Sequence, residues 1–272
     1  AYALLNVKSL VVNPEITLNN VALNAILMNG VLDVKPLTLN VGGGEVSVNA
    51  NVNASQQKIQ LAAVSKGIIV QQLYTPLVAA NNGKFGIISG GNVDVDVNVA
   101  TSGATYRQLV ENADGQVIVI ADKSVVRPGD LSLLSGNFIT QLLKTLRIDT
   151  SKAADMDVNC AVVRADIKNG VASFPKGIAF SAKPLNVVGN GSLNLKSDAL
   201  DFTVRPYSGQ IIDANLAQAL SSFLKIKGTV ESPKIVLDDA QAIKALVGVA
   251  ATGGTSYLGS QLLLDTDPSP CY

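Results

Sequence analysis

Alternation of apolar and polar residues is the dominant pattern along this chain. Residues 93–99 show it most clearly, with valine at every odd position and Asp94, Asp96 and Asn98 at the even ones. Successive side chains of a β-strand point to opposite faces of its sheet, so this strand has a valine face and a polar face. The pattern predicts long antiparallel strands in sheets with one apolar and one solvated side.

Turn residues divide these strands at regular intervals. Asn29-Gly30 and Asn169-Gly170 are strong hairpin signals, because both central residues of a type I′ turn need a positive φ angle. Ser197-Asp198-Ala199 marks a further reversal. We therefore expect residues 166–205 to form a meander of long antiparallel strands.

The order of these features occurs twice along the chain. A hairpin turn is followed by a Pro-Leu strand, a glycine-rich kink and an alternating strand, first around Gly42-Gly43-Gly44 and again around Gly189-Asn190-Gly191. This order predicts two tandem copies of one β unit. We expect one domain over 1–272, with related halves at 15–150 and 155–250 and a tail at 251–272.

Several segments have the apolar spacing of helices instead. Residues 1–14 fit a helix or a strand equally. Helices are expected over 67–80, 105–112, 131–147 and 212–224, and from Asp238 onward. The predicted fold class is therefore α+β, with long antiparallel strands in curved sheets and helices that pack on or cap them.

Composition narrows the functional classes. Apolar residues make up 47% of the 272 residues and aromatic residues only 4%, without tryptophan, so the core must be aliphatic. The 21 basic residues balance the 21 acidic ones, and no basic run occurs. Nucleic-acid binding needs clustered lysine and arginine to neutralise phosphates, so we expect no nucleic-acid partner.

The chain offers no catalytic or cofactor motif. It contains no histidine, which removes the commonest general base and the commonest transition-metal ligand. Neither glycine-rich segment is followed by the Lys-Ser/Thr of a phosphate-binding loop. Asp94, Asp96 and Asn98 share a strand face but are spread too widely for one cation cage. We therefore expect no enzyme, no cofactor and no metal site.

The two cysteines, Cys160 and Cys271, fit either one disulfide or two buried thiols. A disulfide would close a long loop, for which chain-entropy models give roughly 4–5 kcal/mol of stabilisation before strain. It would also hold a terminal segment that otherwise frays. We favour the disulfide, which implies an oxidising compartment.

A set of short motifs resembles the C-terminal region of the AsmA family, the envelope proteins of Gram-negative bacteria. The motifs are dense over 158–238 and looser in the first half. They are Cys160-Ala161, Asp166-Ile167-Lys168-Asn169-Gly170-Val171, Gly189-Asn190-Gly191-Ser192-Leu193-Asn194-Leu195, Leu200-Asp201-Phe202, Arg205-Pro206, Ile226-Lys227-Gly228-Thr229-Val230-Glu231-Ser232-Pro233-Lys234 and Pro270-Cys271.

The resemblance implies a periplasmic domain tethered to the inner membrane by an N-terminal helix outside these residues. It also implies a role in outer-membrane biogenesis and assembly, in which larger relatives look like bridges that carry phospholipid along a hydrophobic β groove. The cysteine positions in the family pattern look like a disulfide between Cys160 and Cys271. The expected partners are phospholipid or another acyl-chain lipid, and other envelope proteins.

Aliphatic strand faces are the candidate groove. The residues we assign to it are Val46, Val48, Val52, Val93, Val95, Val97, Val99, Val187, Leu193 and Leu195. The alternative is that the expected helices at 131–147 and 212–224 cover these faces as an ordinary core, because large exposed apolar areas are uncommon without a partner.

Two other functions compete with lipid binding. An envelope scaffold would bind a protein partner through exposed strand edges by β-augmentation. A hydrolase would use carboxylates, although no residue constellation supports one. Lipid bound to the extracted protein favours the first function, a protein partner without lipid favours the scaffold, and turnover abolished by one aspartate substitution favours the hydrolase.

The disulfide can be tested by thiol labelling. We predict that Cys160 and Cys271 react with a maleimide under denaturing conditions only after reduction, because a disulfide has no free thiolate. Mass spectrometry of the labelled peptides measures the result. Labelling of both cysteines without reductant would contradict the bond and the oxidising compartment.

Overall fold

The fold is described from a computed structural model. It describes residues 1–13, 16–70, 72, 87–126, 155–182, 186–207 and 224–237. Within these ranges nearly every residue lies in a strand or in a turn between strands, and α2 (Tyr106–Glu111) is the helix with defined bounds. The prediction of long antiparallel strands is confirmed.

The described strands form one sheet in which neighbours along the chain are mostly neighbours in space. The order is β1-β2-β3-β4-β5-β7-β8-β10-β11-β12-β13-β14-β15, and every adjacent pair is antiparallel. The first seven strands of this path are β1 (Tyr2–Asn13), β2 (Ile16–Met28), β3 (Val31–Val41), β4 (Gly44–Asn53), β5 (Lys58–Ile69), β7 (Asn92–Ser102) and β8 (Asp114–Ala121).

The remaining six are β10 (Met156–Lys168), β11 (Val171–Ala182), β12 (Asn186–Asn194), β13 (Ala199–Tyr207), β14 (Leu224–Thr229) and β15 (Pro233–Leu237). Two short strands extend one end of the sheet beside β10. They are β6 (Ile87–Gly90) and β9 (Ser124–Val126), and β9 pairs with both β6 and β10.

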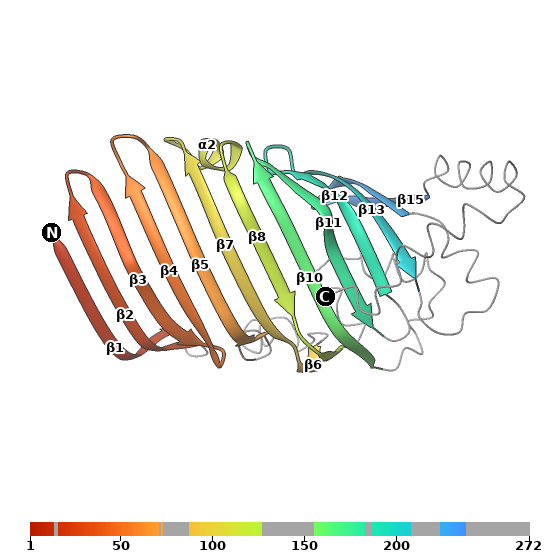
Figure 1. The fold of residues 1–272 in the computed structure, drawn as a ribbon, viewed down its shortest axis with the longest axis horizontal. Helices are drawn as coiled ribbons and strands as arrows, with labels where there is room; N and C mark the ends of the chain where they lie inside the picture. Colours follow the sequence, from red (N-terminus) through yellow and green to blue (C-terminus); the bar gives the residue numbers. More distant parts are fainter. Residues whose placement is uncertain are drawn as a thin grey trace, which may run out of the picture.

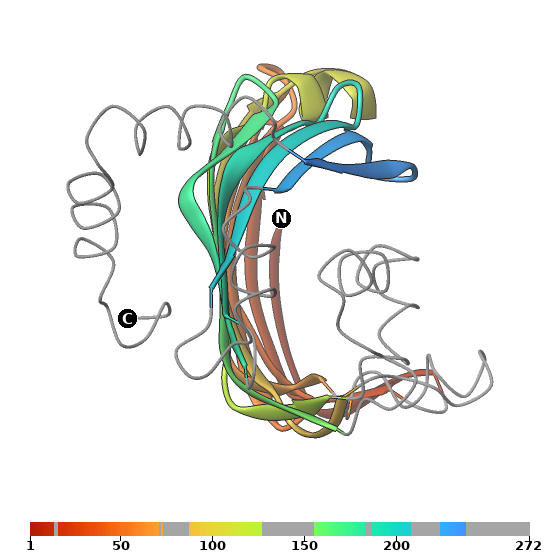
Figure 2. The same ribbon diagram turned by 90° about the vertical axis from the view of Figure 1, so that its right-hand side faces the viewer.

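The sheet is bent into an open trough. Figure 1 shows the strands side by side along the length of the molecule, and Figure 2, viewed along that length, shows each strand arched like a rib. Neighbouring strands lie about 4.8 Å apart, so the path from β1 to β15 follows roughly 60 Å of sheet. The sheet therefore has a concave and a convex side, and both run across the strands.

One face of this sheet is apolar from strand to strand. Directly paired residues of antiparallel strands lie on the same face, so a row of partners traces that face across the sheet. We call the face that contains the following row the inner face. The row runs Leu39, Val46, Ser65, Val95, Val119, Val163, Ile178, Gly189, Val204 and Leu224.

Exposure identifies this face with the inside of the arch. Along β7 the valines are half-buried, whereas Asp94, Asp96 and Asn98 on the other side are exposed. Side chains inside a bend converge and shield one another, and those outside diverge. The position of helix α2 supports this assignment. Thr101 lies on the valine face and donates a hydrogen bond to the Leu109 carbonyl of α2. Figure 2 shows α2 on the inner side of the upper rim.

The predicted turns are found where the sequence places them. Asn29 and Gly30 have φ angles of 49° and 75°, and Asn169 and Gly170 have 47° and 70°. Both pairs join antiparallel strands in a tight hairpin, β2 to β3 and β10 to β11. The reversal predicted at 197–199 is also present, with Asp198 at a φ of 56° between β12 and β13.

The helical part of the fold-class prediction is confirmed only at α2, where Thr105 caps the helix by accepting from the Gln108 amide. The expectation of a helix from residue 67 is wrong at its start, because β5 continues to Ile69. A register shift after Ser65 accommodates Gly67, whose φ is 66°. The expectation for 212–224 is wrong at its end, because Leu224 begins β14. The other expected helices, at 131–147 and from Asp238, lie outside the described residues.

The two predicted halves are not separate in the described sheet. β8 pairs with β10 over seven residue pairs, from Ala121 and Ala161 to Gly115 and Ile167, so the sheet continues across the expected boundary at 150–155. The repeat and the domain limits stay predictions. The tail at 251–272 lies outside the described residues.

A pair of aromatic rings covers a glycine in the C-terminal part of the sheet. Gly191 pairs with Phe174 on one side and with Phe202 on the other, and the ring centroids lie 5.0 Å apart at an interplanar angle of 58°. A Cβ on Gly191 would overlap the Asp201 carbonyl oxygen and approach Phe202 Cδ1 to 2.5 Å. The glycine therefore leaves the space in which the two rings meet.

We predict that Gly191→Ala destabilises the protein by about 1–3 kcal/mol, because the added methyl group must displace backbone or an aromatic ring. Urea unfolding followed by circular dichroism measures the change. The matched control is Ser192→Ala, one residue along on the opposite face, with an expected change within about 0.5 kcal/mol. Equal stability of the Gly191→Ala variant and the wild type would contradict the packing.

Candidate functional site

The central part of the inner face is built from β4, β5, β7 and β8. A second row of partners crosses it beside the first and consists of Leu37, Val48, Ala63, Val97, Val117 and Ala165. Seven predicted groove residues lie here. Val46, Val48 and Val52 are on β4 and Val93, Val95, Val97 and Val99 are on β7, with only β5 between the two sets.

These side chains are accessible. The seven valines are all half-buried, and Leu61 and Val163 on the same face are 37% and 38% exposed. Large side chains that are almost fully buried are correspondingly scarce, with Leu224 as the example among the described residues. The central part of the inner face is therefore an accessible surface and not a sealed core.

The inner face is more buried on the C-terminal strands than in its centre. Val187 on β12 is 8% exposed, and Val204, Leu224 and Ile226 are buried beside it. Leu193, also predicted for the groove, lies on the same face and is half-buried. Leu195 lies in the turn after β12 and outside that strand, where its amide donates to the Gly170 carbonyl. Two strands, β10 and β11, lie between β8 and β12, so the predicted residues form two groups on one face.

Ser65 is the polar member of the row that defines the inner face. It is 6% exposed, and its hydroxyl has no hydrogen-bond partner within the described part of the chain. An unpaired buried hydroxyl costs free energy, and this oxygen is almost completely shielded from solvent. The sequence analysis did not identify Ser65, because serine in an alternating strand is typical of the solvated face.

The outer face carries ion pairs and amide hydrogen bonds between strands, beside apolar residues such as Val64 and Ile120, which are 40% and 42% exposed. Asn51 Nδ2 donates to Asp33 Oδ1 at 3.3 Å, and Gln116 Nε2 donates to Asp166 Oδ1 at 2.8 Å, each between neighbouring strands. Lys227 Nζ lies 3.5 Å from Asp201 Oδ2. The outer face is therefore mixed in chemistry, whereas the rows that cross the inner face are mostly aliphatic.

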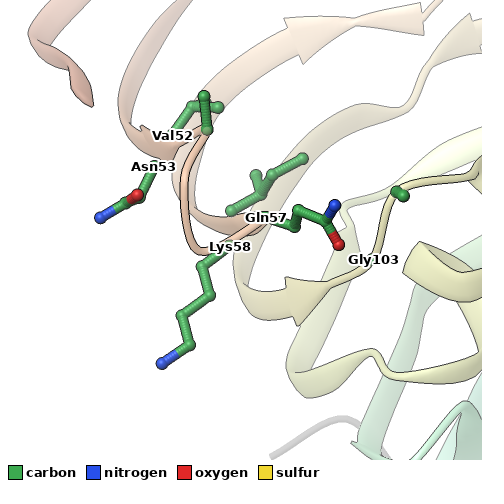
Figure 3. Close-up of a pocket in the computed structure, with 8 residues that line it drawn as sticks. Val52, Asn53, Gln57, Lys58 and Gly103 are labelled. Atoms are coloured by element: carbon green, nitrogen blue, oxygen red, sulfur yellow. The ribbon is translucent and has the colours of Figure 1, made fainter. Parts of the chain in front are cut away.

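A shallow pocket opens at the rim of the inner face. It has a volume of about 320 Å³ and lies where the β4–β5 turn approaches the segment after β7. Val52 and Ile59 join it to the inner face, and Figure 3 shows Gln57 pointing toward Gly103 while Lys58 extends away. The pocket thus has an apolar wall and a polar lip.

At the same rim, Asp114 fixes the second Asn-Gly turn. Its Oδ1 accepts a hydrogen bond of 2.8 Å from the Asn169 amide and lies 3.5 Å from Lys168 Nζ. The hydrogen bond from the Asn169 amide, together with the positive charge of Lys168, holds the pKa of Asp114 below its usual range. Desolvation of the carboxylate opposes this shift but does not cancel it. The contact is therefore present at neutral pH and is lost as the pH falls through that lowered pKa.

The remaining predicted residues do not form a chemical site. Asp94 Oδ1 accepts from the Gly67 amide at 2.7 Å, so it supports the irregular end of β5. No group of three or more acidic or cysteine side chains able to hold a metal occurs in the described ranges. Cys160 is half-buried on β10, and the described residues contain no free cysteine. Cys271 lies outside them, so its bond to Cys160 stays a prediction.

The structure adds residues that the sequence analysis left out of the groove. Ile59, Leu61 and Ala63 on β5 fill the space between the β4 and β7 valines, and Val117 and Val119 continue the face on β8. Their neighbours Ala62, Val64, Ile118 and Ile120 are apolar too, so alternation alone does not say which set faces inward. Only their pairing with the valines of β7, whose face is clear from the sequence, shows which of these residues face inward.

Comparison with known proteins gives one family. The sequence model of the AsmA family matches residues 3–176, a range that runs from β1 into β11. No curated protein and no solved structure matches the chain. Among the described residues, no helix is long and apolar enough to cross a membrane.

We predict that Val97→Asp destabilises the protein by about 1–3 kcal/mol, because the carboxylate would lie between Ala63 and Val117 without a hydrogen-bond partner. Asn98→Asp adds the same charge to the exposed side of the same strand, and a change within about 0.5 kcal/mol is expected. Denaturant unfolding compares the two variants. Equal effects would contradict the assignment of the faces.

Proposed function

This chain belongs to the AsmA family, and from that membership and the accessible inner face we propose that it binds phospholipid, or another acyl-chain lipid, in the service of outer-membrane biogenesis and assembly. The single observation that supports this function best is the row of directly paired, mostly aliphatic residues across ten strands, several of which remain half-exposed. Exposed apolar area of this extent normally has a partner.

The dimensions of the inner face suit acyl chains. A bilayer's hydrocarbon core is about 30 Å thick, so one acyl chain extends over roughly half of that. The inner face follows roughly 60 Å of sheet, which is long enough for lipids to lie one behind another. Val95, Val97 and Val119 present only methyl groups, so the acyl chain meets no directional contact that would hold it at one position.

The polar end of a lipid needs a different environment. The rim pocket offers it, because Gln57 and Asn53 lie beside Val52 and Ile59 at the margin of the inner face. We place the acyl chains along the valine rows and the headgroup at the rim, where water reaches it.

The role we propose is non-catalytic and belongs to the periplasm. The AsmA family is associated with the bacterial envelope. Absence of histidine from the chain and the proposed Cys160–Cys271 disulfide both suit a binding domain in an oxidising compartment. In the full-length protein we expect a membrane anchor to hold the domain at the inner membrane.

Photocrosslinking tests this function. A benzophenone amino acid at Val95, on the inner face, should crosslink phospholipid in cells, and mass spectrometry of the purified protein identifies the adduct. The same amino acid at Asp96, the next residue on the exposed outer face, is the matched control and should give no lipid adduct. Extraction under mild conditions should also recover phospholipid with the wild-type protein.

The contrary results are equally specific. Absence of lipid from both the Val95 adduct and the extracted wild-type protein would overturn lipid binding. A protein adduct at Val95 in place of lipid would instead favour the envelope scaffold. Circular dichroism of both variants establishes that each is folded, so that a missing adduct reports on the ligand.

A further inference from the structure

Three Asn-Gly pairs occur in the described part of the chain, and the structure holds them differently. Asn29-Gly30 and Asn169-Gly170 form hairpin turns, and Asn190-Gly191 lies within β12. Asn82-Gly83 lies outside the described residues. An asparagine that precedes glycine is prone to spontaneous deamidation, because glycine has no side chain to hinder attack by its own amide nitrogen.

The deamidation reaction needs only the chain and water. The glycine nitrogen gives its proton to a base in the solvent and attacks Cγ of the preceding asparagine. An N–Cγ bond forms, the Cγ–Nδ2 bond breaks, and Nδ2 takes up a proton and leaves as ammonia. Water then opens the cyclic imide at either carbonyl and gives aspartate or isoaspartate. Because the peptide between the two residues must rotate before the ring closes, its hydrogen bonds and neighbours control the rate.

The two hairpin turns, Asn29-Gly30 and Asn169-Gly170, have the same backbone geometry. Their asparagines have φ angles of 49° and 47°, and their glycines have 75° and 70°. In each turn the glycine carbonyl accepts a hydrogen bond of 2.9 Å, from the Ala54 amide in the first and from the Leu195 amide in the second. These features are common to both turns and do not distinguish their reactivity.

Additional contacts hold the Asn169-Gly170 turn. The Gly170 amide, whose nitrogen would attack, donates to the Ala113 carbonyl at 3.0 Å, and the Asn169 amide donates to Asp114 Oδ1 at 2.8 Å. Gly170 is buried, and a Cβ added to it would meet two carbonyl oxygens of α2 at 2.7 and 2.9 Å. Rotation of this peptide must therefore break hydrogen bonds and displace neighbouring backbone.

The third pair, Asn190-Gly191, is fixed inside the sheet. Gly191 pairs with Phe174 on β11 and with Phe202 on β13, so its peptide has a strand on each side. A Cβ added to Gly191 would overlap the Asp201 carbonyl oxygen. Rotation of this peptide would therefore disturb the pairing of β12 with its neighbours.

The Asn29-Gly30 turn is open by comparison. Both residues are exposed, and within the described ranges the Gly30 amide donates no hydrogen bond. A Cβ added to Gly30 would meet nothing within 4 Å. The attacking nitrogen is therefore accessible to base, and its peptide can rotate without displacing a neighbour.

We propose that Asn29 is the deamidation site among these three pairs, and that the fold protects Asn169 and Asn190. The modification places a carboxylate in the turn, and isoaspartate also adds a methylene group to the backbone. Met28 pairs directly with Val31 across this turn, so the added atom lengthens a loop that sets the register of the β2–β3 hairpin. The proposal does not depend on lipid binding, so either can fail without the other.

Peptide mapping of the folded protein tests the proposal after incubation at mildly alkaline pH, where the amide nitrogen loses its proton more readily. Electron-transfer fragmentation locates each modified residue and distinguishes isoaspartate from aspartate. Asn29 should convert roughly tenfold faster than Asn169 or Asn190, because a hydrogen bond that must break before reaction slows it by about that factor. No excess at Asn29 over either of the other two would overturn the proposal.

The unfolded chain is the matched control for local sequence. Each of the three asparagines precedes glycine, so in denaturant they should react at similar rates. The ratio of the folded rate to the unfolded rate should then be largest at Asn29. A preference for Asn29 that persists unchanged in denaturant would assign the difference to neighbouring residues and contradict protection by the fold.

Two variants give a second readout on the intact protein. The 21 basic residues balance 21 acidic ones, so one new carboxylate makes the chain net negative, which isoelectric focusing resolves. Asn29→Gly removes the reacting side chain and leaves Gly-Gly, which also suits a type I′ turn. It should form the acidic species more slowly than the wild type, whereas the matched Asn169→Gly should form it at the wild-type rate. An unchanged rate in Asn29→Gly would overturn the assignment, and circular dichroism establishes that both variants are folded.

Discussion

The structure depends on the parity of antiparallel pairing. Each strand reverses the one before it, and partners across every pair share a face, so an apolar position on β4 is continued by partners on the same face of every strand that follows. A slip of one residue at any single pair would turn all later strands over, and a slip before β7 would bring Asp94 and Asp96 inside. Tight turns prevent that slip, because the two Asn-Gly pairs leave no freedom of length between their strands.

The register irregularities lie where they keep the apolar residues of each strand on the inner face. In β3 an extra residue lies between Val34 and Leu37, around Pro36, and in β11 two extra residues lie between Phe174 and Ile178, around Pro175. In both strands the inner face resumes on the correct side after the irregularity. Proline removes an amide from the ladder, and a bulge bends the strand. The bulges therefore give the arch some of its curvature without exchanging the two faces.

The sequence predicted what local chemistry determines. Alternation identified β7 and β4, glycine and asparagine identified the hairpin turns, and Thr105 agreed with the start of α2. Nine of the ten proposed groove residues share one face because each belongs to a strand with clear alternation. Leu195 was misplaced because the strand ends at Asn194, and strand ends are not visible in an apolar pattern.

What the sequence did not predict is long-range. A repeated order of turns and strands suggested two halves, yet β8 and β10 pair through residues that are forty or more positions apart in the sequence. Residues such as Leu61 and Val64 look equivalent in sequence, and only pairing with β7 separates the inward one from the outward one. Whether a valine face is a core or a surface is likewise a property of what lies opposite, not of the valines themselves.

The curvature of the sheet explains why the chain is rich in aliphatic residues and poor in aromatic ones. Inside an arch the side chains converge, so short branched residues fit side by side, and valine is stiff enough to hold one shape there. Large rings are placed where a glycine makes room, as Phe174 and Phe202 do over Gly191. A chain with 4% aromatic residues can thus build a mostly aliphatic inner face, which lipid binding of the proposed kind requires.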